Sequence, residues 1–303
     1  MVERVQKKYH GVAVPVVTPL KLDGSVDIGA CVRQSKQLVA SGMSPFLLGT
    51  TGEASSVSTN DRLHIVESIT REVGNSATVY AGIAGTSLRD ITETASRYFD
   101  HGIKVFVIHL PYYYPLSESQ MLNFFSTVAD KVPAPLMLYN MPSTTHMSIP
   151  VPLLNTLSQH ENIIGVKDSE RDSERHLASI DMWKDREDFS FFVGWGAVMA
   201  EYLLRGADGI APSVGNIVPD LCKQLMDHAT AGNADEANRV QDGMNRAAMI
   251  FQEGKTLGES LAALKYIMHC MGICEPHMLP PLTRLHAEEE ANLAIKAKYL
   301  IGK

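Results

Sequence analysis

A lysine stands directly after a short apolar segment, in a position where its amine would be held away from water. Lys167 follows Ile163-Ile-Gly-Val166. Burial favours the neutral form of an amine, which is the form that attacks a ketone carbonyl. The resulting Schiff base draws electrons toward itself and lets an adjacent carbon–carbon bond form or break. An ion pair with Asp168, or a side chain that extends to water, is the structural alternative for this lysine.

A tyrosine closes the apolar segment that precedes the lysine segment. Tyr139 ends the run of residues 136–139. If the two segments are neighbouring parallel strands, the phenol of Tyr139 can reach the same cavity as the Lys167 amine and pass protons there. The alternative is an aromatic cap on the core whose hydroxyl bonds to the backbone.

A turn of glycine and threonine, Gly49-Thr-Thr-Gly52, follows an earlier apolar segment. Its backbone N–H groups and the hydroxyls of Thr50 and Thr51 can form a concavity that suits a carboxylate. The same pattern is also typical of an ordinary tight turn before a helix. By itself the motif does not decide between the two.

Two other patterns do not fit a metal or a nucleotide. Four candidate metal ligands lie near the C-terminus: His269, Cys270, Cys274 and His277. Their spacing matches no standard zinc site, and we expect no metal. Gly194-Trp-Gly196 follows an apolar run as a dinucleotide-binding turn would, but Met199 stands where the third glycine should be, so no nicotinamide cofactor is expected.

Eight short apolar segments alternate with helix-sized amphipathic segments along the chain. They are residues 11–15, 45–48, 79–83, 105–109, 136–139, 163–166, 189–193 and 208–211. Apolar runs without polar alternation are typical of parallel strands buried on both faces. Eight such units favour a closed (β/α)8 barrel over an open doubly wound sheet, which normally carries a glycine-rich phosphate turn after its first strand. In such a barrel the chemistry lies at the carboxyl ends of the strands, where the residues discussed above are found.

Three further helical segments follow the eighth unit with no strands between them. They cover about residues 233–253, 257–271 and 287–301. We therefore expect residues 1–232 to form the barrel and residues 233–303 to form a C-terminal helical extension packed on it. A length of 303 residues suits a barrel of roughly 250 residues with such an addition.

Composition excludes several kinds of partner. With 45% hydrophobic and 20% charged residues, the chain is globular rather than disordered or fibrous. A formal charge of −7 without a Lys/Arg-rich block argues against nucleic acid. The segment Met1–His10 has no apolar run, and no stretch approaches the roughly 18 apolar residues that span a membrane, so we expect a cytoplasmic protein without a membrane partner. The four cysteines are expected to be reduced.

Four motifs, taken in order, resemble the dihydrodipicolinate synthase/N-acetylneuraminate lyase family. They are Gly49-Thr-Thr-Gly-Glu53, Pro111-Tyr-Tyr113, Tyr139-Asn-Met-Pro142 and Gly165-Val-Lys-Asp-Ser169. The resemblance covers nearly the whole chain, including the opening segment 11–19 and the helical C-terminus. It implies a class I aldolase that acts on pyruvate or another 2-keto acid without metal or organic cofactor. It also implies a homotetramer made of two tight dimers.

The resemblance assigns a catalytic role to four residues. Lys167 matches the Schiff-base lysine and Tyr139 the proton-relay tyrosine. Thr50 matches the threonine that passes protons to that tyrosine. Tyr113 matches a tyrosine that one subunit lends to its neighbour across the tight dimer interface.

It also points to substrate-binding positions. Thr51, with the turn at Gly49, matches the part that holds the pyruvate carboxylate. Ser169 occupies a hydroxyl position that some lyases of the family use against the substrate. Gly194 falls where those lyases place a substrate-binding backbone.

Two departures from the family pattern bear on the second substrate. Thr144 stands where dihydrodipicolinate synthases usually have an arginine for the carboxylate of aspartate semialdehyde, and threonine cannot supply that bidentate contact. Gly196-Ala197 stands where sialic acid lyases tend to have two acidic residues for sugar hydroxyls. Both specific activities are therefore disfavoured.

Several hypotheses about the substrate stay open. The favoured ones are a 2-keto-3-deoxy sugar acid and a 4-hydroxy-2-oxoglutarate-type substrate, cleaved, condensed or dehydrated. Dihydrodipicolinate synthesis with a relocated arginine stays possible because Arg171 and Arg175 follow the sixth strand. N-acetylneuraminate cleavage and a non-catalytic ligand-binding barrel are the remaining alternatives.

Overall fold

The computed structural model describes residues 7–301. Residues 1–6 and 302–303 lie outside the described residues. Part of the predicted polar N-terminus, the start of the predicted barrel domain and the end of the predicted C-terminal extension therefore also lie outside them. Of the described helices, none is long and apolar enough to cross a membrane.

The strands form a closed parallel barrel, which confirms the predicted (β/α)8 architecture. In order they are β1 (Gly11–Pro15), β2 (Ser44–Leu47), β3 (Tyr80–Gly82), β4 (Val105–His109), β5 (Leu136–Asn140), β6 (Ile163–Asp168), β7 (Ser190–Val193) and β8 (Gly209–Ile210). Each strand pairs with the next, and β8 pairs with β1 to close the ring. The predicted apolar runs correspond to the observed strands to within two residues at either end. Lys167 and Tyr139 lie near the carboxyl ends of β6 and β5. The sequence predicted that Lys167 directly follows its strand, whereas it lies within β6.

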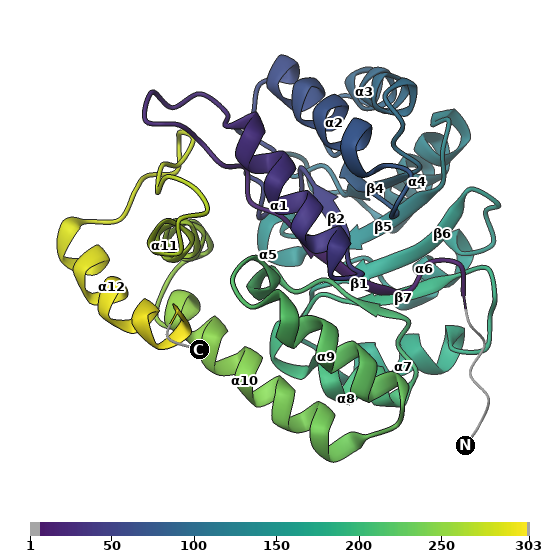
Figure 1. Ribbon diagram of the computed structural model, residues 1–303. Helices are drawn as coiled ribbons and strands as arrows, with labels where there is room; N and C mark the ends of the chain where they lie inside the picture. The colour runs from purple at the N-terminus through teal and green to yellow at the C-terminus, as the bar shows by residue number, and fades with distance from the viewer. Residues whose placement is uncertain (1–6, 302–303) are drawn as a thin grey trace.

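Helices cover the outside of the barrel (Figure 1). They are α1 (Ile28–Ala40), α2 (Thr59–Val73), α3 (Leu88–Asp100), α4 (Glu118–Lys131), α5 (Pro142–Thr145), α6 (Val151–Leu157), α7 (Ser173–Trp183), α8 (Met199–Arg205) and α9 (Pro219–Thr230). Side-chain caps begin several of them. Ser117 and Gln120, for example, form a capping box that satisfies free N–H groups at the start of α4.

Three helices follow the barrel without intervening strands, as predicted. They are α10 (Ala234–Gln252), α11 (Leu257–Cys270) and α12 (Ala287–Ile301). Figure 1 shows α11 and α12 set to one side of the barrel, with α10 running from them along α9 and α8. Helix α11 buries several residues on more than one face, which is expected of a helix enclosed between the barrel and α12.

The apolar residues form two cores, because strand residues alternate between the two faces of the barrel wall. The outer core lies between strands and helices, and the inner core fills the barrel. Along β4, Phe106 and Ile108 belong to the outer core, whereas Val105 and Val107 belong to the inner one. His109 is the next residue on the inner face.

Strand β6 contains an irregularity that changes which side chains face inward. Leu136 of β5 pairs with Ile163, but the next residue, Met137, pairs with Gly165, so Ile164 is an extra residue. Ile164 lies in the inner core and Val166 in the outer core. Strict alternation from Ile164 would turn Lys167 outward. The bulge therefore reverses the alternation and brings Lys167 onto the inner face beside Tyr139.

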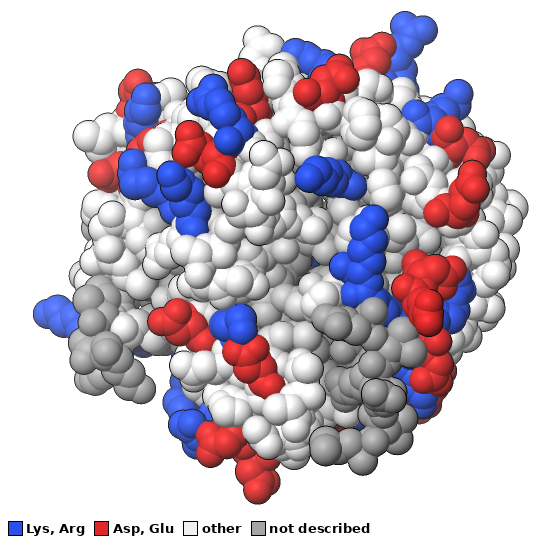
Figure 2. Space-filling model, turned by 45° about the vertical axis from the view of Figure 1, so that its right-hand side comes forward, with Lys and Arg blue, Asp and Glu red and all other residues white. Residues whose placement is uncertain are grey.

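The surface carries both signs of charge. On the face in Figure 2, acidic and basic side chains are interspersed. On this face charges of both signs lie near one another.

Candidate active site

The predicted lysine and tyrosine lie side by side inside the barrel mouth. Tyr139 and Lys167 are register partners on β5 and β6. The Nζ atom of Lys167 lies 3.9 Å from the centre of the Tyr139 ring and 5.0 Å from that of the Phe46 ring. Only 6% of Lys167 is exposed. An amine enclosed by two aromatic faces is held in place without a carboxylate partner.

The Tyr139 hydroxyl is surrounded by the groups that a proton relay requires. Its oxygen lies 3.5 Å from Oγ1 of Thr50, at the long limit of a hydrogen bond. Burial raises the pKa of Tyr139, but the charge of Lys167 and hydrogen bonds with Thr50, Ser169 and Lys167 outweigh it, so the net pKa lies below 10.0. A phenol with a lowered pKa gives up its proton more readily, as an acid/base group must.

Asp168 does not pair with Lys167, contrary to the structural alternative considered for that lysine. Its side chain is fully buried on the opposite face of β6. There Oδ2 accepts a hydrogen bond from Nε of Arg175 at 2.6 Å, and Oδ1 accepts one from Nδ2 of Asn140 at 2.9 Å. The charge of Asp168 is thus balanced by Arg175 outside the barrel and not by Lys167.

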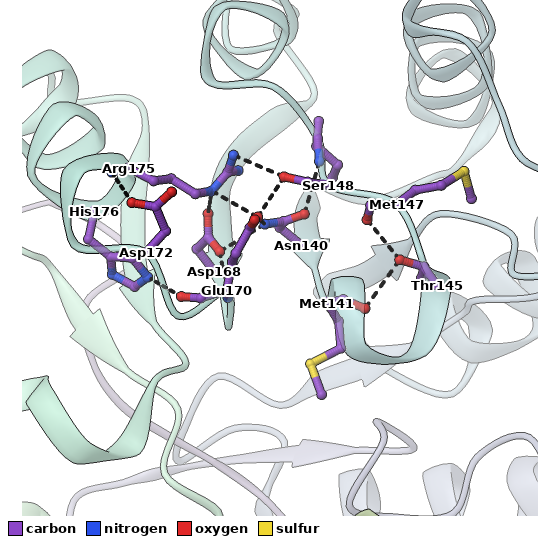
Figure 3. A network of polar contacts seen from close by, with 11 residues as sticks. Asn140, Met141, Thr145, Met147, Ser148, Asp168, Glu170, Asp172, Arg175 and His176 are labelled. Atoms are coloured by element: carbon purple, nitrogen blue, oxygen red, sulfur yellow. Dashed lines mark hydrogen bonds and ion pairs between the residues drawn. The ribbon is translucent and has the colours of Figure 1, made fainter.

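Figure 3 shows the polar network to which Asp168 belongs. The carboxylate of Glu170 accepts hydrogen bonds from Nδ2 of Asn140 at 2.8 Å and from Oγ of Ser148 at 2.5 Å. His176 Nε2 donates to the Glu170 carbonyl oxygen at 2.9 Å, since a carbonyl can only accept. Asn140 adjoins Tyr139 in sequence and Asp168 adjoins Lys167. The network therefore ties together the strand ends that carry Tyr139 and Lys167.

The network also fixes Arg175, one of the two arginines considered as replacements for the missing family arginine. Its guanidinium lies outside the barrel wall with Asp168, Glu170 and Ser148. It does not line the cavity described below. The hypothesis that Arg175 binds a substrate carboxylate is therefore not supported by its position.

A cavity of about 500 Å³ opens at the carboxyl ends of strands β2 to β5. It is lined by Phe46, Leu48, Gly49, Thr50, Glu53, Ala54, Ser55, Ser56, Gly82, Ala84, Val107, His109, Tyr112, Tyr139, Thr144, Leu257, Gly258, Leu261, Pro281 and Leu282. Lys167 is not among these residues. Its Nζ lies against the rings of Phe46 and Tyr139, both of which form part of the wall. The cavity therefore ends next to the amine.

The C-terminal extension completes one wall of this cavity through Leu257, Gly258 and Leu261 of α11. A buried ion pair between Glu53 and Lys265 joins that helix to the loop after β2. Glu53 also accepts a hydrogen bond from the backbone N–H of Leu279 at 2.7 Å. The Gly49–Glu53 segment is thus held in place by α11 and the loop that follows it.

The remaining predicted substrate-binding residues take different positions. Gly49 and Thr144 line the cavity. Thr51 is buried, 7% exposed, and is not one of the lining residues. Gly194 lies against Ser169: a Cβ added to it would come within 2.0 Å of the Ser169 Oγ. Glycine is therefore required at 194 as long as Ser169 keeps its position beside Tyr139.

Tyr113 lies away from the cavity of its own chain. It is 73% exposed, and its ring packs edge-on against that of Tyr114 with ring centres 4.9 Å apart. The neighbouring Tyr112 lines the cavity instead. Tyr113 therefore forms no part of the wall of this cavity.

His109 is a cavity residue that the sequence predictions missed. It pairs in register with Tyr139, and the two ring centres are 6.2 Å apart in an edge-on arrangement. The signal was present in the segment Val105–His109, because a two-residue period places His109 on the same face as Val105 and Val107. His109 is the last residue within β4, whereas the predicted site residues on this side of the barrel begin after it, at Leu110.

The candidate metal ligands near the C-terminus do not come together as a metal-binding group in the described part of the chain. No group of three or more His, Cys, Asp and Glu side chains in that part of the chain could hold an ion. Of the four candidates near the C-terminus, His269 forms an ion-pair contact with Glu275, with 3.4 Å between Nδ1 and Oε2. Cys270 and Cys274 are free thiols.

Comparison with known proteins agrees with this arrangement. The model of the dihydrodipicolinate synthetase family matches residues 8–299. An uncharacterized DapA-like lyase of Thermococcus kodakarensis is 30% identical over 279 residues, covering 90% of this chain and 94% of the relative. Among solved structures, dihydrodipicolinate synthase from Bacteroides thetaiotaomicron superposes with a TM-score of 0.90 at 29% identity, covering 97% of this chain and 99% of the other. YagE, a prophage protein of Escherichia coli K12 solved in complex with pyruvate, gives a TM-score of 0.90 at 26% identity, with the same coverage.

A closed (β/α)8 barrel with a buried lysine on its sixth strand and a tyrosine beside it defines a lyase of the class I aldolase type. More particularly, the chain belongs to the dihydrodipicolinate synthetase family.

Proposed function

We propose that this enzyme cleaves or forms 2-keto acids through a Schiff base between Lys167 and pyruvate or a pyruvate-containing substrate. The observation that carries the proposal is the position of the Lys167 Nζ, 3.9 Å from the centre of the Tyr139 ring at the inner end of the cavity. The pyruvate complex of YagE, a family member with the same fold, supports the choice of ligand.

In this mechanism Lys167 first gives up its proton, its amine then attacks the ketone carbon, and loss of water from the carbinolamine forms the protonated imine (iminium). For cleavage, the hydroxyl on C4 loses its proton, the C3–C4 bond breaks, and its electron pair moves toward the iminium nitrogen while an aldehyde leaves. The enamine takes a proton at C3, and water releases pyruvate and the free lysine. Tyr139 and Thr50 exchange the protons, in keeping with the lowered pKa of the tyrosine.

The second half of the substrate is less constrained than the pyruvate half. Dihydrodipicolinate synthesis is disfavoured, because Thr144 replaces the expected arginine and Arg175 is bound to Asp168. Sialic acid cleavage is disfavoured because Gly196 and Ala197 offer no side-chain acceptor, and their carbonyl oxygens accept hydrogen bonds from α10. A 2-keto-3-deoxy sugar acid or a 4-hydroxy-2-oxoglutarate-type compound fits these departures.

We further propose that the enzyme works as a homotetramer of two tight dimers in which Tyr113 reaches the neighbouring site. The exposure of Tyr113 and Tyr114 supports this assembly, because two large aromatic side chains gain more from burial in an interface than from contact with water.

Hydrogen exchange tests the function without knowledge of the second substrate. An enamine makes the methyl protons of pyruvate exchange with solvent. We expect the wild-type protein to replace them with deuterium in D₂O, as followed by proton NMR, and Lys167→Ala to abolish the exchange. The surface variant Lys104→Ala serves as the control. Exchange that persists in Lys167→Ala at the wild-type rate would contradict the proposal.

A further inference from the structure

His109 lies in the candidate active site, but the proposed Schiff-base chemistry assigns it no role. It is the last residue of β4 and faces the inside of the barrel. His109 pairs in register with Tyr139, and Tyr139 pairs in register with Lys167. The three side chains therefore form one layer across the mouth of the barrel. His109 also lines the cavity that ends beside the Lys167 amine.

The hydrogen bonding of the His109 ring determines what it can offer a ligand. Its Nδ1 lies 2.7 Å from the carbonyl oxygen of Leu110. Because a carbonyl oxygen only accepts hydrogen bonds, Nδ1 must carry the ring proton. In the neutral ring Nε2 is then an acceptor, and it forms no hydrogen bond with any of the described residues.

The surroundings keep the ring neutral. Burial lowers the pKa of His109, and the charge of Lys167 lowers it further. The hydrogen bond to Leu110 raises this pKa by less, so the net pKa is below 6.5. At neutral pH the ring therefore carries no charge, and the cavity presents an acceptor rather than a cation at this point.

The other lining residues do not supply a cation either. Among the residues that line the cavity, Glu53 is the only one with a charged side chain, and it is paired with Lys265. Thr144 lines the cavity as well, and its hydroxyl donates to the carbonyl oxygen of Met141 at 3.2 Å, which leaves it as an acceptor toward a ligand. Ser55, Ser56 and Tyr112 add hydroxyl groups to the wall that can donate or accept hydrogen bonds. A hydroxyl group on the ligand would therefore find partners of both kinds, whereas a second carboxylate would find no unpaired cation among the lining residues.

We infer that His109 is a specificity-determining residue: its Nε2 accepts a hydrogen bond from a hydroxyl group on the aldehyde half of the substrate. The substrate class is accordingly a 2-keto acid with a hydroxylated tail and no second carboxylate. This inference rests on the proposed Schiff-base function and deepens it, because it separates the two substrate types that the departures from the family pattern leave open.

Three aldehydes test the inference in condensation with pyruvate at pH 7.5. Glyceraldehyde carries hydroxyl groups, propionaldehyde has the same carbon skeleton without them, and glyoxylate carries a carboxylate. We expect the wild-type kcat/KM to be highest for glyceraldehyde, by about tenfold over propionaldehyde, as the gain of one or more buried hydrogen bonds implies. A wild-type preference for glyoxylate would overturn the inference without the need for any variant.

Variants of His109 locate the effect. His109→Phe keeps an aromatic ring but removes the acceptor, so the ratio of kcat/KM for glyceraldehyde to that for propionaldehyde should fall about tenfold. His109→Gln, which restores an acceptor oxygen, should keep part of the ratio, and it also serves if the Phe variant does not fold. The surface variant His64→Phe is the matched control. A ratio that stays at the wild-type value in both His109 variants would overturn the inference.

The result is distinguishable from failure of the proposed function. If the wild-type protein exchanges the methyl protons of pyruvate but shows no preference that depends on His109, the Schiff-base function stands and the role of His109 is wrong. If the wild-type protein neither exchanges those protons nor condenses any of the three aldehydes, both are overturned.

Discussion

The Nζ atom of Lys167 lies 3.9 Å from the centre of the Tyr139 ring, and the two residues are register partners on adjacent strands. Through this contact the charge of the Lys167 amine lowers the pKa of the Tyr139 phenol. It depends on the extra residue in β6, since without the bulge at Ile164 the lysine would face the helices.

The pKa of Tyr139 should rise when the charge of Lys167 is removed. In the wild-type protein burial raises this pKa, but the charge of Lys167 and three hydrogen bonds bring it below 10.0. In Lys167→Met only the hydrogen bonds with Thr50 and Ser169 still oppose the effect of burial on the pKa of Tyr139. The phenol should therefore lose its proton only at a higher pH. NMR titration of protein labelled with ¹³C at the tyrosine ζ carbon measures this, with Tyr139→Phe to assign the signal. An unchanged or lowered pKa would contradict the coupling.

The bulge in β6 should tolerate no side chain at position 165. A Cβ on Gly165 would lie 2.4 Å from the carbonyl oxygen of Ser190, so the neighbouring strand would have to move. Gly165→Ala should lower the free energy of unfolding by about 3 kcal/mol, measured by urea unfolding at fixed protein concentration. Gly196→Ala is the control, because a Cβ there meets nothing within 4 Å, and its effect should stay within about 0.5 kcal/mol. Equal effects of the two substitutions would contradict the steric argument.

Arg175 should be essential to stability rather than to substrate binding. Arg175→Met leaves the fully buried carboxylate of Asp168 without its cation, and loss of one partner of such a pair costs about 3–5 kcal/mol. Adding Asp168→Asn should recover part of the loss in urea unfolding. The opposite pattern, full stability with a KM for pyruvate raised at least tenfold, would show instead that Arg175 binds substrate.

Tyr113 should act on the site of a neighbouring subunit. Tyr113→Phe and Lys167→Ala should each be weakly active or inactive alone. When the two are unfolded, mixed in equal amounts and refolded together, about a quarter of wild-type activity should return, because half of the dimers are hybrids and each hybrid holds one complete site. If Tyr113 acts within its own chain, the mixture should show no more activity than the average of the two variants.

Most of the fold could be predicted because buried parallel strands appear as continuous apolar runs that differ clearly from the amphipathic helices between them. Gly165 was a signal for the bulge, because an isolated glycine inside a strand often marks one. Which residue is the extra one depends on how β5 and β6 pair, and only the structure shows that pairing. His109 could have been found from the alternation in β4. Arg175 pairs with Asp168, 7 residues away in the chain, and Lys265 pairs with Glu53, 212 residues away. Both pairs depend on tertiary packing, so only the folded structure reveals them.

Trapping of the Schiff base tests the central claim most directly. The wild-type protein, Lys167→Ala and Lys104→Ala are incubated with pyruvate, reduced with borohydride and analysed by mass spectrometry before and after digestion. The account predicts one stable adduct per chain in the wild-type and Lys104→Ala proteins, on a peptide that contains Lys167, and none in Lys167→Ala. A folded wild-type protein that forms no adduct, or one whose adduct lies on another lysine, would contradict the account.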